Sequence, residues 1–110
     1  MSELLQEVQQ VIANTLERAN EAKLTLHSPE EAYAVLKNHY DGVKENRRQI
    51  KLFLSDFWDD VKEDNFICYP EDLMRINDCA VSCAEAAIKV AATAQKTLDC
   101  IKNANAPGAA

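Results

Sequence analysis

The chain has 110 residues and 47% of them are hydrophobic, so it has room for one domain with a modest core and is no disordered acidic tail. It contains only two glycines and three prolines, which excludes a many-stranded fold and favours long helices. Its formal net charge of −6 argues against general nucleic-acid binding.

The first predicted helix begins at Ser2, which can cap it, and ends near residues 22–24. Its apolar residues recur at spacings of three and four, which places them on one face of a helix. This face contains Leu4, Leu5, Val8, Val11, Ile12, Thr15, Leu16 and Ala19. The other side is polar, and residues 25–27 form a short connection to the next helix.

The second predicted helix has a strong start signal. Ser28 is the expected N-cap, Pro29 suits the first helical position, and Glu31 completes a capping box. Apolar residues then share one helical face as far as residue 61. They are Ala32, Leu36, Tyr40, Val43, Ile50, Leu54, Phe57, Trp58 and Val61. This pattern predicts one helix to about Glu63, and a break near Asn46 is the alternative.

The second helix also carries charge of both signs. A basic stripe of Lys37, Lys44, Arg48 and Lys51 precedes an acidic run in residues 56–64. The stripe is either a solvated face with pairs four residues apart or a surface that faces phosphates. Arg47 lies on the apolar face, where it either extends its charge past the edge of the core or binds a ligand.

The third predicted helix covers residues 69–102 and begins with Pro70 in its first turn. Phe66 and Ile67, in the preceding turn, are expected to plug the end of a helical bundle. A continuous apolar seam follows the helix at alternating spacings of three and four. It contains Leu73, Ile76, Ala80, Cys83, Ala87, Val90, Ala94, Thr97 and Ile101. Most of these side chains are small, so a partner helix could approach closely.

The predicted fold is therefore an all-α, long-helix bundle with three main helices, the middle one either continuous or split. Residues 1–102 form a single helical domain, and residues 103–110 form a flexible C-terminal tail. Helices this long in so short a chain leave apolar seams exposed, so we expect a homodimer or higher homo-oligomer to complete the bundle. No apolar run reaches the about 18 residues of a membrane span, so we expect no membrane insertion and a cytoplasmic location.

The four cysteines are Cys68, Cys79, Cys83 and Cys100. The last three, with a histidine, could in principle build a zinc site, but their spacing is not that of a zinc motif. The favoured interpretation is reduced thiols that serve as small hydrophobic side chains. We assign no metal to them.

Three segments in order resemble MazG-like all-α nucleoside triphosphate pyrophosphohydrolases, especially their small phage forms. Residues 7–22 leading into residues 27–36 (HSPEEAYAVL) are similar to the start of that family. Residues 57–62 (FWDDVK) resemble its L-W-x-E-V segment, and residues 86–94 (AAIKVAATA) resemble its E-x-x-D/Q-V-A-A-x-A helix. The resemblance covers most of residues 5–101 and implies a MazG-like helical fold.

The chemistry of that family requires carboxylates in E-E-x-x-E and E-x-x-D patterns, which hold Mg²⁺ against the substrate phosphates. Here the first pattern corresponds to residues 38–42 (NHYDG) or 52–56 (LFLSD), depending on the register. In the second pattern, Ala86 and Lys89 occupy the carboxylate positions, and Glu85 is one position off. Both motifs are degenerate, so we assign no catalytic residue, and Mg²⁺ would be a cofactor only of an active enzyme.

Three functions stay open. The first is a non-catalytic MazG-like protein that binds or sequesters a nucleotide without metal, through basic groups for phosphate and aromatic rings for the base. Its candidate nucleotide-binding residues are Tyr33, Tyr40, Arg47, Arg48, Lys51, Trp58 and Lys89. The second is a helical protein–protein interaction module, such as a phage or host regulatory protein. The third, which the missing motifs disfavour, is an active pyrophosphohydrolase that draws carboxylates from Asp56, Asp59, Asp60 and Glu85.

Overall fold

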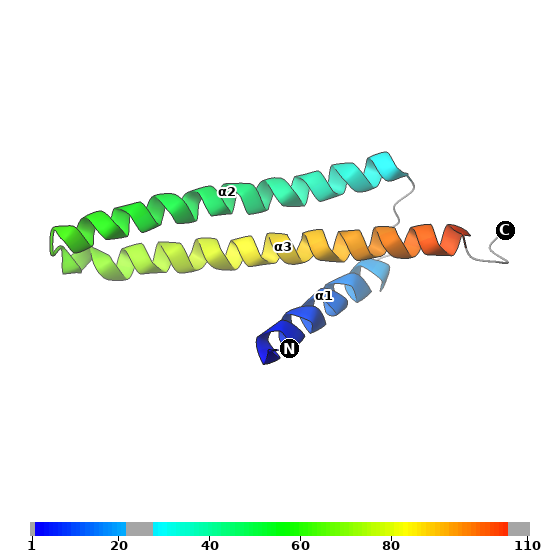
Figure 1. Ribbon diagram of the computed structural model, residues 1–110, viewed down its shortest axis with the longest axis horizontal. Coiled ribbons are helices and arrows are strands. Elements are labelled where there is room, and N and C mark those ends of the chain that lie inside the picture. The colour runs from blue at the N-terminus through cyan, green and yellow to red at the C-terminus, as the bar shows by residue number, and fades with distance from the viewer. Residues whose placement is uncertain (1, 22–27, 106–110) are drawn as a thin grey trace. The chain divides into compact units, whose positions relative to one another are not determined.

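The computed structural model describes residues 2–21 and 28–105 (Figure 1). These residues form α1 (Glu3–Glu21), α2 (Pro29–Lys62), the short 3₁₀ helix η1 (Phe66–Cys68) and α3 (Tyr69–Asn105). The described ranges contain no strand, which confirms the all-α prediction. None of the described helices is both long and apolar enough to cross a lipid bilayer.

The helix boundaries follow the sequence signals closely. The Ser2 Oγ accepts a hydrogen bond from the Leu5 N–H, and the Ser28 Oγ accepts one from the Glu31 N–H, both at 3.1 Å. These contacts confirm the two predicted serine caps. The second helix is continuous, so the alternative of a break near Asn46 is wrong. The connection at residues 25–27 lies outside the described residues.

A left-handed residue ends α2. Asp64 has a φ of 53°, the Asp64 N–H donates to the Val61 carbonyl at 3.2 Å, and the Asn65 N–H donates to the Asp60 carbonyl at 2.9 Å. Together these bonds form a Schellman motif, which satisfies the last carbonyls of the helix. The chain then turns through η1 into α3.

The chain consists of two compact units, Met1–His39 with Ala87–Ala110, and Tyr40–Ala86. The second unit is an antiparallel helical hairpin, made by the end of α2 and the start of α3 (Figure 1). We call this second unit the hairpin. The first unit contains α1, the start of α2 and the end of α3.

Small and polar groups line the interface between the two helices of the hairpin. The Cys83 Sγ lies 3.8 Å from the Val43 carbonyl, and the Cys79 Sγ lies 3.5 Å from the Gln49 Oε1. A Cβ added at Gly42 would lie 3.4 Å from the Cβ of Ala86. At the closed end, the Phe57 and Tyr69 rings meet edge to face with centroids 5.4 Å apart. The interface is therefore close, and the large side chains that mark it, such as Ile50, Phe57 and Ile76, are only half-buried.

The predicted apolar seam of α3 is wrong at every second position. Ile76 and Cys83 are half-buried against α2, but Leu73 and Ala80 are exposed, and the inward positions between them are Asp72 and Cys79. The same alternation continues in the first unit, where three seam residues are exposed. They are Ala87, Ala94 and Ile101. The apolar stripe of α3 is wider than a single helix can cover, so one edge of the stripe stays in solvent.

Two further predictions need correction. Phe66 and Ile67 do not plug the bundle, because their side chains are 69% and 89% exposed and only the Phe66 ring contacts Tyr69. The third helix continues to Asn105, three residues beyond its predicted end at Lys102. Residues 106–110 of that tail lie outside the described residues.

In the first unit, the C-terminal half of α1 contacts the C-terminal half of α3. The Lys96 Nζ donates to the Asn20 Oδ1 at 3.2 Å, and Ile12, Leu16 and Ala19 are half-buried. Ala92, on α3, is one of the two buried apolar residues of the described chain. The N-terminal half of α1 keeps its large apolar side chains exposed. These side chains are Leu4, Leu5, Val8 and Val11.

Candidate functional site

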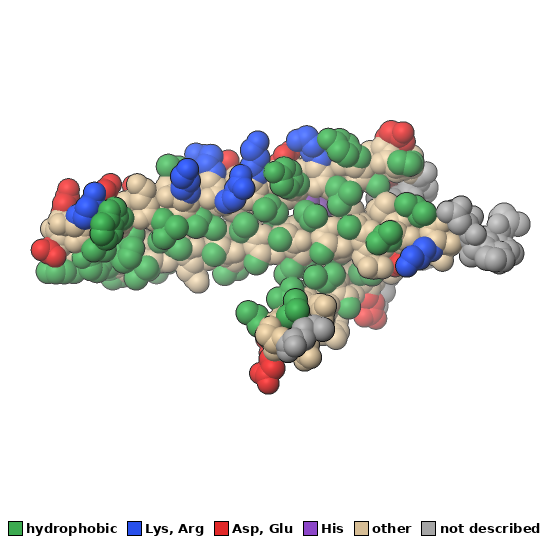
Figure 2. Space-filling view, in the orientation of Figure 1, with side chains coloured by type: hydrophobic (Ala, Val, Ile, Leu, Met, Phe, Trp, Pro, Cys, Tyr) green, Lys and Arg blue, Asp and Glu red, His purple; other side chains and the backbone are tan. Residues whose placement is uncertain are grey.

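A shallow groove with a volume of about 550 Å³ lies on the part of α2 that belongs to the hairpin. Its lining is entirely charged and comes from residues spaced one helical turn apart. It consists of Asp41, Lys44, Glu45, Arg47, Arg48 and Lys51. Figure 2 shows basic side chains gathered along α2 and apolar side chains along α3. The groove therefore presents a mainly cationic surface to solvent.

One cation of the groove is already paired. The Arg48 guanidinium donates to both carboxylate oxygens of Glu45, at 2.6 and 3.1 Å, and Gln49 donates to the same carboxylate at 3.1 Å. These two hydrogen bonds, first that of Arg48, lower the pKa of Glu45 to about 2. The same glutamate raises the pKa of Arg48. Lys44, Arg47 and Lys51 form no ion pair with any residue that the structure describes.

The structure brings three of the seven candidate nucleotide-binding residues, Arg47, Arg48 and Lys51, into one groove. Lys44 also lines this groove. The sequence placed Lys44 in the basic stripe but not among the candidate binding residues. Its spacing of three residues from Arg47 was the signal that could have placed it there. Tyr40 is exposed immediately before the groove. The remaining three candidates lie elsewhere.

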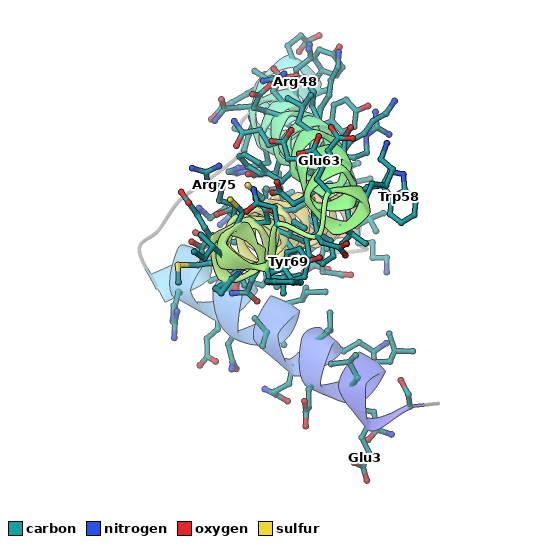
Figure 3. The ribbon with its side chains drawn as sticks, turned by 90° about the vertical axis from the view of Figure 1, so that its left-hand side faces the viewer. Glu3, Arg48, Trp58, Glu63, Tyr69 and Arg75 are labelled. Atoms are coloured by element: carbon teal, nitrogen blue, oxygen red, sulfur yellow. The ribbon has the colours of Figure 1, made fainter. Side chains whose placement is uncertain are left out.

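Trp58 lies two turns beyond Lys51 on α2, is 59% exposed, and has the Lys62 Nζ 5.8 Å from its ring centroid. Figure 3 shows it on the opposite side of the hairpin end from Arg75. Tyr33 and Lys89 belong to the first unit. The aromatic candidates therefore do not line the groove in which the cations gather.

A second polar cluster, which sequence reasoning missed, lies at the closed end of the hairpin. Asp72 is only 6% exposed, and its Oδ2 has no hydrogen-bond partner among the residues that the structure describes. A hydrogen bond with the Asp60 carboxyl, burial, and the charges of Asp60 and Asp56 together raise the pKa of Asp72 to about 6, against the opposing charge of Arg75. The Asp60 Oδ1 accepts a further bond from the Asn65 Nδ2 at 3.2 Å. Two carboxyl groups therefore share a partly buried site, and a proton between them relieves their repulsion.

The thiol of Cys68 faces the same cluster. Burial, followed by the charges of Asp60 and Asp72, raises the pKa of the Cys68 thiol, which keeps it protonated. All four cysteines are free, and Cys79 and Cys83 are half-buried against α2, as expected for small hydrophobic side chains. Among residues 2–21 and 28–105, no three histidine, cysteine or carboxylate side chains are placed to hold a metal ion.

Comparison of the chain with protein-family models, with curated proteins and with solved structures finds no significant match. The resemblance to MazG-like proteins stays a prediction from the sequence. The function has to follow from the surfaces of the chain itself.

Proposed function

We propose that this chain is a helical protein–protein interaction module that self-associates through its exposed apolar faces. A single observation carries the proposal: no large side chain is fully buried in the described part of the chain. The buried apolar residues there are Ala32 and Ala92. A chain that is 47% hydrophobic and leaves many of its large side chains exposed has little core of its own in the described residues.

The exposed apolar side chains are large and occur on every helix. They are Leu4, Leu5, Val8, Val11, Tyr33, Tyr40, Leu52, Leu54, Trp58, Phe66, Ile67, Leu73, Met74, Val81, Leu98 and Ile101. Complete burial of one such aliphatic side chain stabilises a structure by about 1.5–3 kcal/mol. Where exposed apolar side chains adjoin in a large patch, they mark interaction sites in soluble proteins.

Thermal unfolding at increasing protein concentration tests this proposal. Because assembly stabilises only the folded chain, the melting temperature should rise between about 1 and about 100 µM protein. Leu54→Lys, which places a charge on an exposed apolar position, should abolish most of that rise. An identical melting temperature at all concentrations in the wild type would overturn the proposal.

A second candidate function is metal-free binding of a nucleotide through the groove on α2. Three groove cations, Lys44, Arg47 and Lys51, form no ion pair with a described residue, and such groups bind phosphate. On a MazG-like scaffold, as the sequence resemblance implies, such a protein would sequester or sense its ligand. Exposed Tyr40 is the nearest of the candidate rings in sequence for stacking on a base.

Thermal shift against nucleoside mono-, di- and triphosphates, with and without Mg²⁺, tests this second function. A ligand at about 100 times its dissociation constant adds about 2.7 kcal/mol to stability. The expected result is a shift without Mg²⁺ that Arg47→Glu with Lys51→Glu removes and Lys102→Glu leaves intact. A shift only with Mg²⁺, or none with any nucleotide, would contradict it.

A further inference from the structure

Two exposed apolar surfaces of the chain have opposite charges beside them. The first is the N-terminal half of α1, where Leu4, Leu5, Val8 and Val11 are 36–68% exposed. On a helical wheel these four side chains share one face, and Glu7 borders it with Glu3 one turn before. We call this surface the α1 face. It is apolar with an acidic edge.

The second surface lies on one side of the hairpin. Val43, Ile50 and Phe57 of α2 and Ile76 and Cys83 of α3 mark the buried line of each helix. Residues four positions after these core residues are rotated in the same sense about each helix axis. Because the two helices are antiparallel, the same rotation points to the same side of the hairpin.

That side carries exposed residues from both helices. We call it the hairpin face, and it consists of Arg47, Lys51, Leu54, Trp58, Leu73 and Ala80. Arg75, which stacks over the Phe53 ring at 5.6 Å, lies on the other side (Figure 3). The hairpin face therefore combines three large apolar side chains, a small alanine and a basic edge.

The two faces complement each other in charge and in spacing. Glu3 and Glu7 are four residues apart on α1, and Arg47 and Lys51 are four residues apart on α2, which is about 6 Å along a helix in each case. Ala80 leaves room for a large side chain of an incoming helix, and Leu54 and Leu73 offer it apolar contacts. An acidic amphipathic helix is the occupant that fits this surface.

We propose that α1 of a second copy of this chain docks on the hairpin face, and that the exchange is reciprocal. This inference rests on the proposed self-association and names its contact surfaces. Reciprocal exchange gives a closed two-fold dimer, in which each copy covers both exposed faces of the other copy. Two such contacts bury twice the area of one. This brings the interface closer to the area that a stable interface requires, which is about 800 Å² per partner.

Charge reversal in two separate variants tests the proposal. Glu3→Lys with Glu7→Lys makes the α1 face basic, and Arg47→Glu with Lys51→Glu makes the hairpin face acidic. Each variant alone would place like charges together at both contacts, so its dimer should dissociate about tenfold or more readily than the wild type. In an equimolar mixture, both contacts of the mixed dimer pair opposite charges, so the mixture should recover wild-type affinity.

The readout is sedimentation equilibrium of each variant and of the mixture, with circular dichroism to show that the helices are intact. Glu17→Lys is the control, because it reverses one glutamate on the opposite side of α1 and should leave the dimer unchanged. Recovery in the mixture supports exchange between copies.

Variants that dimerise as well as the wild type would overturn the exchange while self-association stands. Dissociated variants whose mixture stays monomeric would also overturn it, because the charges would then act within one chain. A wild type that is monomeric at every concentration would overturn the self-association as well.

Discussion

At the residue scale, the closed end of the hairpin holds an unfavourable pair of carboxyl groups. Asp72 occupies an inward position on α3, and Asp60 approaches it from α2. The nearest cation, Arg75, is engaged with Glu71 at 2.5 Å and with the Phe53 ring. Asp56 adds negative charge from α2, and Cys68 in η1 stays protonated. A proton bound by the pair therefore relieves the repulsion between its carboxyl groups.

This pair makes stability depend on pH. The folded pKa of Asp72 is about 6, above the ordinary aspartate value of 3.8, so between these values the folded state binds more protons than the unfolded state. Stability from this group is fully present below the unfolded pKa and is lost as the pH rises through about 6. Asp72→Asn should therefore leave stability at about pH 4 little changed and raise it at about pH 7.5.

Urea unfolding of the wild type and of Asp72→Asn over that pH range measures the effect as a difference between the two proteins. Using the difference removes the contribution of Glu45, whose pKa is lowered and whose stabilisation is lost only as the pH falls toward 2. A difference in free energy of unfolding that is the same at both pH values would contradict a shared proton.

Asp64 has an unfavourable backbone conformation, because its φ of 53° lies in the left-handed region. Glycine adopts this region without a Cβ penalty and is the usual residue at this position of a Schellman motif. Asp64→Gly should therefore stabilise the protein by about 0.5–1 kcal/mol in urea unfolding. Asp64→Asn removes the charge but keeps a side chain that tolerates the same φ. The difference in stability between the glycine and asparagine variants therefore isolates the backbone effect. A less stable glycine variant would show that the Asp64 side chain supports the turn.

At the scale of the elements, the hairpin depends on close approach rather than on large apolar contacts. Gly42 lies in the interior of α2, where glycine is unfavourable, and a Cβ there would make an ordinary contact of 3.4 Å with Ala86. Gly42→Ala should therefore stabilise the protein by about 0.5–1 kcal/mol in urea unfolding. Gly42→Leu should instead destabilise it by about 1–3 kcal/mol through overpacking. Destabilisation by alanine would mean that the helices approach more closely still.

The same elements show how far the sequence can predict this fold. Local signals were sufficient for the helix starts, because Ser2 and Ser28 cap through their own side chains. The sequence could not predict which side of α3 faces α2. The apolar stripe of α3 is so wide that either of its two edges could be the buried one. For the same reason the inward position of Asp72 could not be predicted.

The candidate site was predictable only within one helix. Arg47, Arg48 and Lys51 share the groove because their spacing on α2 is fixed by helix geometry alone. Tyr33 and Lys89 were assigned from the resemblance to a family and from residue chemistry, and the structure places them in the other unit. Sequence spacing predicts neighbours along a helix, but it carries little information on which helices meet.

At the scale of the whole molecule, the described chain is a set of long amphipathic helices on which a surplus of large apolar side chains stays exposed. Self-association is predicted because it would cover these exposed side chains. The acidic edge of the α1 face and the basic edge of the hairpin face would make the contact between copies specific. Self-association is the central claim.

Sedimentation equilibrium of the wild-type protein between about 1 and about 100 µM tests that claim most directly. We predict a concentration-dependent mass that reaches twice the 12.3 kDa of one chain. A mass of one chain at every concentration would contradict self-association, and with it the view that a second copy covers the exposed apolar faces.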